Sequence, residues 1–260
     1  MTRQAMKRDW SAIMVESDGQ LAGRLAAAAG EILLDLRADG ALSGKALGRV
    51  GDEAANAMLC RELRRARPDD GLLSEEEKDH AARLSQSRVW IVDPLDGTRE
   101  YGEGRSDWAV HVALAIDGVA AVGAVALPGL GLTLSSDAPP PLPPANAPLK
   151  MLVSRTRPAA EALFVADRIG AELLAMGSAG AKAMAVVRGE ADIYLHTGGQ
   201  YEWDNCAPAA VAAAAGLHVS RVDGSPLRYN NVDTYLPDLL ICREELAAEV
   251  LRIASEYSPD

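Results

Sequence analysis

Two carboxylates stand three residues apart in residues 89–98, which read Val-Trp-Ile-Val-Asp-Pro-Leu-Asp-Gly-Thr. The four apolar residues at 89–92 predict a buried strand, and the Asp-Gly pair predicts a tight turn at its end. Asp93 and Asp96 would then lie close together. Because two neighbouring anions repel each other, such a pair favours a bound cation. From these residues alone, a metal site and a pair of ordinary turns remain equally open.

Three further acidic positions lie at the ends of predicted elements. Asp52 is expected to open a helix, Glu75 follows a short apolar segment beside Glu76, and Asp204 precedes an Ala-rich helix. Each has a simpler interpretation as a helix N-cap or as part of a solvated charge run. Taken together, however, the acids occupy the element ends at which α/β folds place their ligands.

The hydrophobic periodicity predicts an α+β first half and an α/β second half. The first half has helices expected at 20–38 and about 52–66, followed by a hairpin of 108–116 and 119–127 around Asp117-Gly118. In the second half, strands and helices alternate. The expected strands are 150–154, 172–176, 191–196 and 239–242, and the expected helices are one from about 158, one ending near 188, 205–215 and 243–257.

The Pro-rich segment 138–148 is the best candidate for a domain boundary. Its six prolines are incompatible with a helix or an inner strand. We therefore predict an N-terminal α+β domain at 1–137 that carries the main metal-binding loops. A C-terminal α/β domain at 149–260 would carry Asp204 and the residues that select the substrate.

The composition excludes several classes of partner. A formal net charge of −11 argues against a nucleic-acid polymer, although it permits a small phosphorylated ligand beside a local metal cluster. No stretch of about 18 apolar residues is present, so no membrane span is expected. The three cysteines (Cys60, Cys206 and Cys242) are odd in number and widely separated, which favours a reducing compartment. We therefore expect a cytoplasmic protein.

Three motifs together resemble those of a known family. The pattern is Glu-Glu at 75–76, Asp-Pro-Leu-Asp-Gly-Thr at 93–98, and Trp-Asp at 203–204 before an Ala-rich helix. In order and approximate spacing it resembles the inositol monophosphatase-like, Mg²⁺-dependent phosphatases over nearly the whole chain. Gly-Thr-Arg-Glu-Tyr at 97–101 and Gly-Ser-x-x-x-Lys at 177–182 are similar to the CysQ-type 3′(2′),5′-bisphosphate nucleotidases, especially actinobacterial members. The resemblance implies a layered αβαβα sandwich.

The same resemblance implies roles for the acidic residues. Two or three Mg²⁺ ions would be held by Glu75, Asp93, Asp96, Asp204 and the backbone carbonyl of Leu95. Asp52, Glu75 and Thr98 would be the catalytic residues, with the Thr98 hydroxyl paired to Asp52 and a metal-activated water attacking phosphorus in line. No covalent phosphoenzyme would be required.

The implied substrate is a nucleotide bisphosphate, and several residues are expected to contact it. The expected activity is removal of the 3′-phosphate of 3′-phosphoadenosine 5′-phosphate, with 3′-phosphoadenylyl sulfate as a second candidate substrate, in sulfur assimilation and nucleotide recycling. Li⁺ sensitivity and a homodimer are further expectations of the resemblance. The expected substrate-binding residues are Asp96, Gly97, Thr98, Arg99, Ser178, Lys182 and Arg228. For Arg99, Lys182 and Arg228, ordinary surface ion pairing is the alternative.

The sequence also leaves alternatives open. Arg49-Val50-Gly51-Asp52 replaces the Val-Thr-x-x-Asp of many relatives, which removes a hydroxyl near the weakest expected metal site. Inositol-1-phosphatase or fructose-1,6-bisphosphatase activity is the main alternative, and a non-catalytic nucleotide- or metal-binding regulator is a remote one. A haloacid-dehalogenase-type phosphatase is excluded by spacing, because two residues separate Asp93 from Asp96 where that mechanism needs one.

Overall fold

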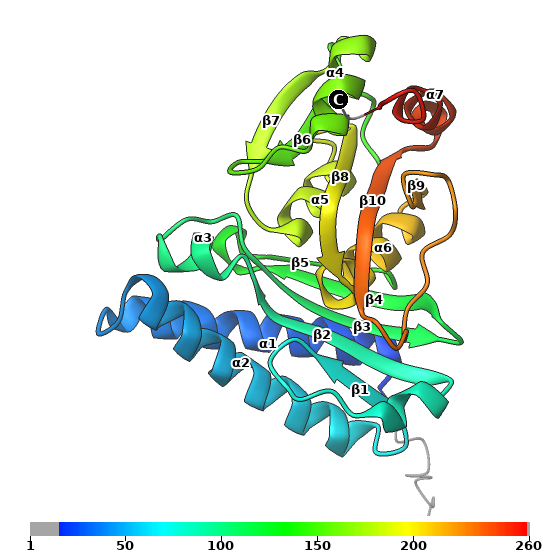
Figure 1. Cartoon of the computed structure of the whole chain (residues 1–260). Helices are drawn as coiled ribbons and strands as arrows, with labels where there is room; N and C mark the ends of the chain where they lie inside the picture. The colour runs from blue at the N-terminus through cyan, green and yellow to red at the C-terminus, as the bar shows by residue number, and fades with distance from the viewer. Residues whose placement is uncertain (1–15, 259–260) are drawn as a thin grey trace, which may run out of the picture.

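Two five-stranded sheets alternate with three layers of helices in the computed structural model, which describes residues 16–258 (Figure 1). One helical pair covers the outer face of the first sheet, a second pair lies between the sheets, and a third covers the outer face of the second sheet. The predicted αβαβα sandwich is therefore confirmed. Residues 1–15 of the predicted N-terminal domain lie outside the described residues.

The first sheet has the strand order β1-β2-β3-β4-β5, with β1 parallel to β2 and the other neighbours antiparallel. Its strands are β1 (Gly71–Ser74), β2 (Arg88–Asp96), β3 (Ala109–Ile116), β4 (Val119–Leu127) and β5 (Leu132–Ser135). Helices α1 (Asp18–Asp39) and α2 (Gly44–Ala66) cover one face. Because β2 is buried on both faces, Trp90 and Val92 pack toward these helices, whereas Val89 and Ile91 face the interior of the sandwich.

The second sheet is mixed and has the order β7-β6-β8-β10-β9. Its strands are β6 (Lys150–Ser154), β7 (Glu172–Met176), β8 (Ile193–Tyr201), β9 (Leu217–Ser220) and β10 (Tyr235–Arg243). Strand β6 runs parallel to both β7 and β8, and β10 runs antiparallel to β8 and β9. Helices α4 (Ala160–Ile169) and α7 (Glu244–Ala254) pack on its outer face around a third apolar cluster.

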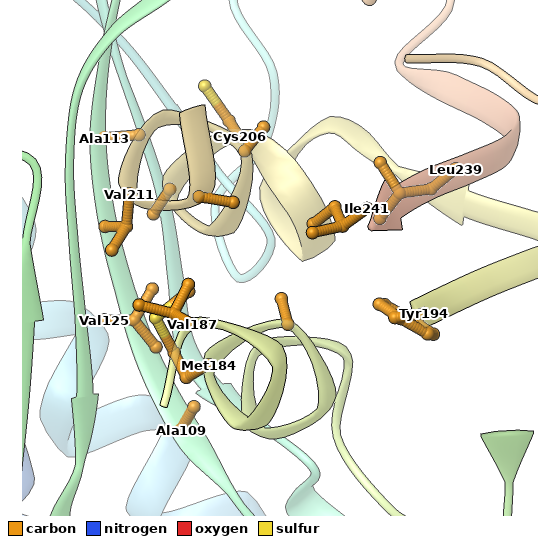
Figure 2. Close-up of a cluster of buried hydrophobic side chains, with 14 of the residues drawn as sticks. Ala109, Ala113, Val125, Met184, Val187, Tyr194, Cys206, Val211, Leu239 and Ile241 are labelled. Carbon is orange, nitrogen blue, oxygen red and sulfur yellow. The ribbon is translucent and has the colours of Figure 1, made fainter. Parts of the chain in front are cut away.

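The middle layer joins the two sheets through small aliphatic side chains. It consists of α5 (Ala179–Val187) and α6 (Glu202–Ala214). Figure 2 shows Met184 and Val187 of α5 beside Val125 of the first sheet. A Cβ atom at Gly123 would lie 2.5 Å from the Ala207 carbonyl oxygen, so α6 approaches β4 at backbone distance. Alanine and glycine thus permit the close packing of the middle layer on the first sheet.

One predicted helix start is wrong, and the correction concerns a candidate catalytic residue. Helix α2 begins at Gly44 instead of near 52, so Asp52 lies inside the helix and is not its N-cap. The intervening glycines have a packing role: a Cβ atom at Gly48 would lie 2.6 Å from Thr98 Cγ2, and one at Gly51 would lie 2.8 Å from Leu33. Gly48 and Gly51 weaken the helical signal in the sequence, which is why the start of α2 was not predicted. The same glycines allow α2 to pack closely against its neighbours.

The other elements agree with prediction in type, with several additions. The hairpin of β3 and β4 is confirmed, and no helix or strand interrupts 138–148. The division into domains at 1–137 and 149–260 stays a prediction, since α5 and α6 follow the connector yet pack on the first sheet. Strands β5 and β9 and the short helices η1 (Ala81–Ser85), α3 (Thr98–Gly102) and η2 (Pro128–Leu130) were not predicted. Among residues 16–258, no helix is long and apolar enough to cross a bilayer.

Candidate active site

An extra residue in β2 turns both carboxylates of the 93–98 segment to one face. In the β2–β3 pairing, Asp93 lies opposite His111 and Asp96 opposite Ala109, so three steps along β2 match two steps along β3. In a regular strand, residues three apart point to opposite faces, and the bulge removes that difference. Pro94 fits within the bulge because it has no N–H to contribute to the ladder.

Acidic residues of the first sheet and of helix α6 converge at this point. Carboxylate oxygens of Asp93, Asp96 and Asp204 all lie within 4.8 Å of one another. Glu75 extends β1 beside them, since its backbone N–H donates to the Val92 carbonyl across 3.3 Å. The structure thus brings together the four acids that were expected to hold metal.

Crowding of these acids shifts their ionisation strongly. Burial and the charges of Glu75, Asp96 and Asp204 raise the pKa of Asp93 well above its usual range. Partial removal of solvent and the Asp204 charge raise the pKa of Glu75 to about 7, although the residue keeps exposed surface. Burial and Asp96 likewise raise the pKa of Asp204 to about 6. His111 and Lys182 offset this repulsion only in part, since the pKa of Asp204 stays raised despite their charges.

Asp96 is the exception, because the second half of the chain surrounds it with donors. Its Oδ2 accepts hydrogen bonds from the Ser178 hydroxyl at 2.5 Å and the Gly180 N–H at 2.6 Å, and its Oδ1 accepts from the Ala179 N–H at 3.2 Å. Burial opposes ionisation, but His111 and these donors lower the pKa of Asp96 to about 2. Asp96 is therefore held as an anion at the N-terminus of α5.

Asp52 and Thr98 form the pair that was expected. The Thr98 hydroxyl lies 3.2 Å from Asp52 Oδ2 and 3.1 Å from the Leu95 carbonyl oxygen. Gly97 precedes it with φ +88°, a left-handed conformation that favours glycine, and so begins α3 at Thr98. Burial and the charges of Glu76 and Glu75 raise the pKa of Asp52 to about 8.

The donor set fits divalent metal ions with oxygen ligands. Asp93 Oδ2 is buried and has no hydrogen-bond partner among residues 16–258, whereas Asp93 Oδ1 accepts the Leu95 N–H at 3.0 Å. A buried carboxylate oxygen without a donor is costly unless a cation approaches it. Asp93 Oδ2 is therefore free to bind a cation. Asp96 Oδ2 already accepts two hydrogen bonds, so Asp96 Oδ1 is the more available ligand atom of that carboxylate. Oxygen ligands of this kind suit Mg²⁺.

A cavity of about 640 Å³ extends from Asp96 and Asp204 toward a group of basic residues. Its basic lining residues are Arg99, Arg155, Arg157, Lys182 and His196. Arg99 is paired with Glu103 at 2.8 Å and Arg155 with Glu100 at 2.7 Å. Among residues 16–258, Arg157 forms no ion pair, so its guanidinium group is available to a ligand.

Two of the predicted substrate residues are used differently from what was expected. Lys182 is buried, and its Nζ donates to the carbonyl oxygens of Gly177 and Ser178 at 3.0 and 2.6 Å. Burial lowers the pKa of Lys182 to about 8, against the attraction of Asp96 and Glu100. The exposed Arg228 does not line the cavity, so the structure does not bring it to the other candidates.

Arg157 and His111 are among the residues of the site that sequence reasoning missed. Arg157 belongs to Ser154-Arg155-Thr156-Arg157, directly after β6, and a basic pair at a strand end was a usable signal. His111 was hidden in an apolar run, yet its Nδ1 bonds to the Trp203 carbonyl at 2.9 Å and its Nε2 lies 3.3 Å from Asp96 Oδ2. Burial lowers the pKa of His111, but the proximity of Asp96 raises it above its usual value overall.

The sequence of residues 19–258 matches the inositol monophosphatase family. The chain belongs to this family. A protein of Mycobacterium leprae (strain TN) named 3′-phosphoadenosine 5′-phosphate phosphatase is 48% identical over 265 residues, covering 96% of this chain and 97% of that protein. The Escherichia coli (strain K12) protein named 3′(2′),5′-bisphosphate nucleotidase CysQ is 31% identical over 207 residues, covering 72% of this chain and 81% of CysQ.

Solved structures of inositol monophosphatase family members share the same fold. CysQ from Bacteroides thetaiotaomicron superposes with a TM-score of 0.76 at 26% identity, covering 89% of this chain and 98% of that one. Inositol monophosphatase from Anabaena (Nostoc) sp. PCC 7120 gives a TM-score of 0.71 at 23% identity, over 93% and 96% of the two chains, which shows the fold alone.

Proposed function

We propose that this inositol monophosphatase family member is an Mg²⁺-dependent phosphatase that removes the 3′-phosphate of 3′-phosphoadenosine 5′-phosphate. 3′-Phosphoadenylyl sulfate is a second candidate substrate. The relatives named for this activity support the choice of substrate. The carboxylate cluster, in which Asp93 Oδ2 accepts no hydrogen bond from the described residues, supports metal binding. Two or three Mg²⁺ ions, a cytoplasmic location, Li⁺ sensitivity and a homodimer belong to the same proposal.

One observation carries the preference for a bisphosphate. The cavity is lined by Asp96 and Asp204 and also by Lys182 and Arg157, and Arg157 forms no ion pair with the described part of the chain. A phosphate to be cleaved would lie at the acids with the metal, and a second phosphate would need its own cation. Arg157 suits this because a guanidinium group binds phosphate oxygens through two parallel N–H groups. An inositol monophosphate has no second anionic group to use it.

The residues of the site divide the chemical work. Glu75, Asp93, Asp96, Asp204 and the Leu95 carbonyl would hold the metal ions. When bound, Mg²⁺ lowers the pKa of a water molecule and offsets the charge of the phosphate. Asp52 accepts the Thr98 hydroxyl proton in a hydrogen bond, which leaves a lone pair of Oγ1 to orient a water molecule. In this proposal, the second phosphate would be bound by Arg157, with the hydroxyls of Ser154 and Thr156 beside it. Lys182, whose Nζ donates to the Gly177 and Ser178 carbonyls, would contribute positive charge at the cavity wall.

A side-by-side turnover assay tests the proposal. Purified protein with Mg²⁺ would receive 3′-phosphoadenosine 5′-phosphate, inositol 1-phosphate and fructose 1,6-bisphosphate, with Asp93→Asn protein as the blank. We expect kcat/KM to be at least about tenfold higher for the nucleotide, a difference of about 1.4 kcal/mol. Preference for either sugar phosphate would overturn the substrate, and absence of turnover on all three would favour the non-catalytic regulator.

A further inference from the structure

His111 lies inside the sandwich, between metal ligands from the two halves of the chain. It is the polar member of the β3 face whose other residues, Ala109, Ala113 and Ala115, belong to the core around the middle layer. Its side chain is fully buried. A histidine at this position is therefore surrounded by protein and has no access to substrate.

The two ring nitrogens of His111 face two different segments. Nδ1 lies 2.9 Å from the carbonyl oxygen of Trp203, which directly precedes Asp204 in the first turn of α6. Nε2 lies 3.3 Å from Asp96 Oδ2, without the alignment of a full hydrogen bond, and has no other polar partner among residues 16–258. The rigid imidazole ring thus spans the gap between the Asp96 carboxylate and the backbone that carries Asp204.

The space around the ring is fitted to it from α5. A Cβ atom at Gly180 would lie 2.0 Å from His111 Nε2 and 3.0 Å from two ring carbons. The Gly180 N–H itself donates to Asp96 Oδ2. Gly180 does not have a positive φ, so its backbone conformation does not require glycine. Glycine is required here because a side chain would collide with the His111 ring.

We propose that His111 is a positioning residue that sets the separation of Asp96 and Asp204, and with it the affinity of the site for divalent cations. The inference rests on the metal site of the proposed function. The ring acts as a spacer: it fixes the first turn of α6 through Trp203 and limits the movement of Asp96 toward β3. Groups that orient metal ligands in this way commonly change metal affinity by about 10–100-fold when they are removed.

Mn²⁺ binding, followed by electron paramagnetic resonance and calorimetry without substrate, tests this role separately from turnover. His111→Phe keeps the ring size but loses both polar contacts, and we expect the Mn²⁺ dissociation constant to rise about 10–100-fold. His111→Asn retains a donor for Trp203, and His111→Gln retains one for Asp96, so each should lose less than His111→Phe. His218→Phe, on β9 beside Ser220, is the matched control and should bind Mn²⁺ as the wild type does.

A double-mutant cycle with Gly180→Ala adds a readout that general destabilisation would not move. The added methyl group should weaken Mn²⁺ binding in the wild type, and much less in a His111→Ala background, where the ring no longer fills the space. Unchanged Mn²⁺ affinity in His111→Asn and His111→Gln would overturn the inference even if His111→Phe fails to fold. If the wild type binds no Mn²⁺, the metal site itself is wrong and the inference falls with it.

Discussion

The Ser178 hydroxyl donates a hydrogen bond of 2.5 Å to Asp96 Oδ2, so a residue of the second half of the chain holds a carboxylate of the first. The same oxygen of Ser178 accepts the Ala181 N–H at 2.9 Å and so also caps α5. Ser178 adopts φ +44°, which a residue with a Cβ atom rarely does. Its position is therefore strained, and its hydroxyl has two tasks there.

Two substitutions of Ser178 should separate the role of its hydroxyl from the strain of its backbone. Ser178→Ala and Ser178→Gly both remove the hydrogen bond to Asp96, and we expect each to weaken Mn²⁺ binding by about tenfold. Because glycine tolerates the positive φ, Ser178→Gly should be more stable than Ser178→Ala by about 1 kcal/mol. Denaturant unfolding and calorimetry would check both effects. Equal stability of the two variants would contradict the strain, and unchanged Mn²⁺ affinity would contradict the role of the hydroxyl.

Neutralising a buried acid should exchange activity for stability. Asp93→Asn and Asp204→Asn each remove a metal ligand, so we expect Mg²⁺-dependent hydrolysis to be lost in both. With EDTA present, Asp93→Asn should melt higher than the wild type, because it relieves the repulsion from Glu75, Asp96 and Asp204. Each kcal/mol gained would raise Tm by about 2–4 °C in a chain of this size.

Differential scanning calorimetry with and without Mg²⁺ would measure this exchange. Asp167→Asn, on the exposed face of α4, is the matched control and should change neither property. Full hydrolytic activity in the Asp93 or Asp204 variant would show that the ligand assignment is incorrect.

Without metal, the stability of the protein should fall as pH rises between about 4 and 8. The pKa of Asp52 is raised to about 8 by burial and by Glu76 and Glu75, whereas an unfolded aspartate titrates near about 3.9. In that window the folded state keeps a proton that the unfolded state has lost, so its stability declines with pH until the folded pKa is passed. Thermal melts in EDTA from pH 4 to 9 would show the slope, and Asp52→Asn should make it shallower. An equal slope in that variant would exclude Asp52 as a cause.

Arg157 should discriminate between substrates with one and with two phosphates. A lost hydrogen bond to a charged group costs about 1.5–3 kcal/mol. We therefore expect Arg157→Gln to lower kcat/KM for 3′-phosphoadenosine 5′-phosphate by about 10–100-fold, while leaving 3′-AMP nearly unaffected. Arg168→Gln on α4 is the control, since that side chain packs over Phe164 away from the cavity. An equal decrease in kcat/KM for both nucleotides would show that Arg157 does not bind the second phosphate.

The strands that carry the site were readable from sequence, whereas their relative placement was not. Continuous apolar runs and the Asp117-Gly118 turn identified β2, β3 and β4, and the acidic motifs identified the metal-ligand candidates. The bulge at Pro94 was not foreseen, because strand pairing and not local composition decides which face Asp96 takes. Packing similarly explains why the start of α2 was missed: its glycines weaken the helix locally but permit its contacts with Thr98 and Leu33.

The contacts that join the two halves of the chain at the site were the hardest to predict. Nothing local to His111 distinguishes it from a buried histidine with a structural partner. The contacts of His111 with the site depend on α5 and α6, whose N-termini come together near Asp96 only after both halves have folded. Sequence spacing does not encode such a contact.

Both faces of β3 are buried, so the metal site depends on the register in which β3 pairs with β2. If β3 paired one residue out of step, His111 would turn toward the helices α1 and α2, and Val110 or Val112 would take its place beside Asp96. The misaligned chain would bind the cation poorly. Because a ligand stabilises only the form that binds it, the divalent ion would then increase the population of chains folded in the correct register.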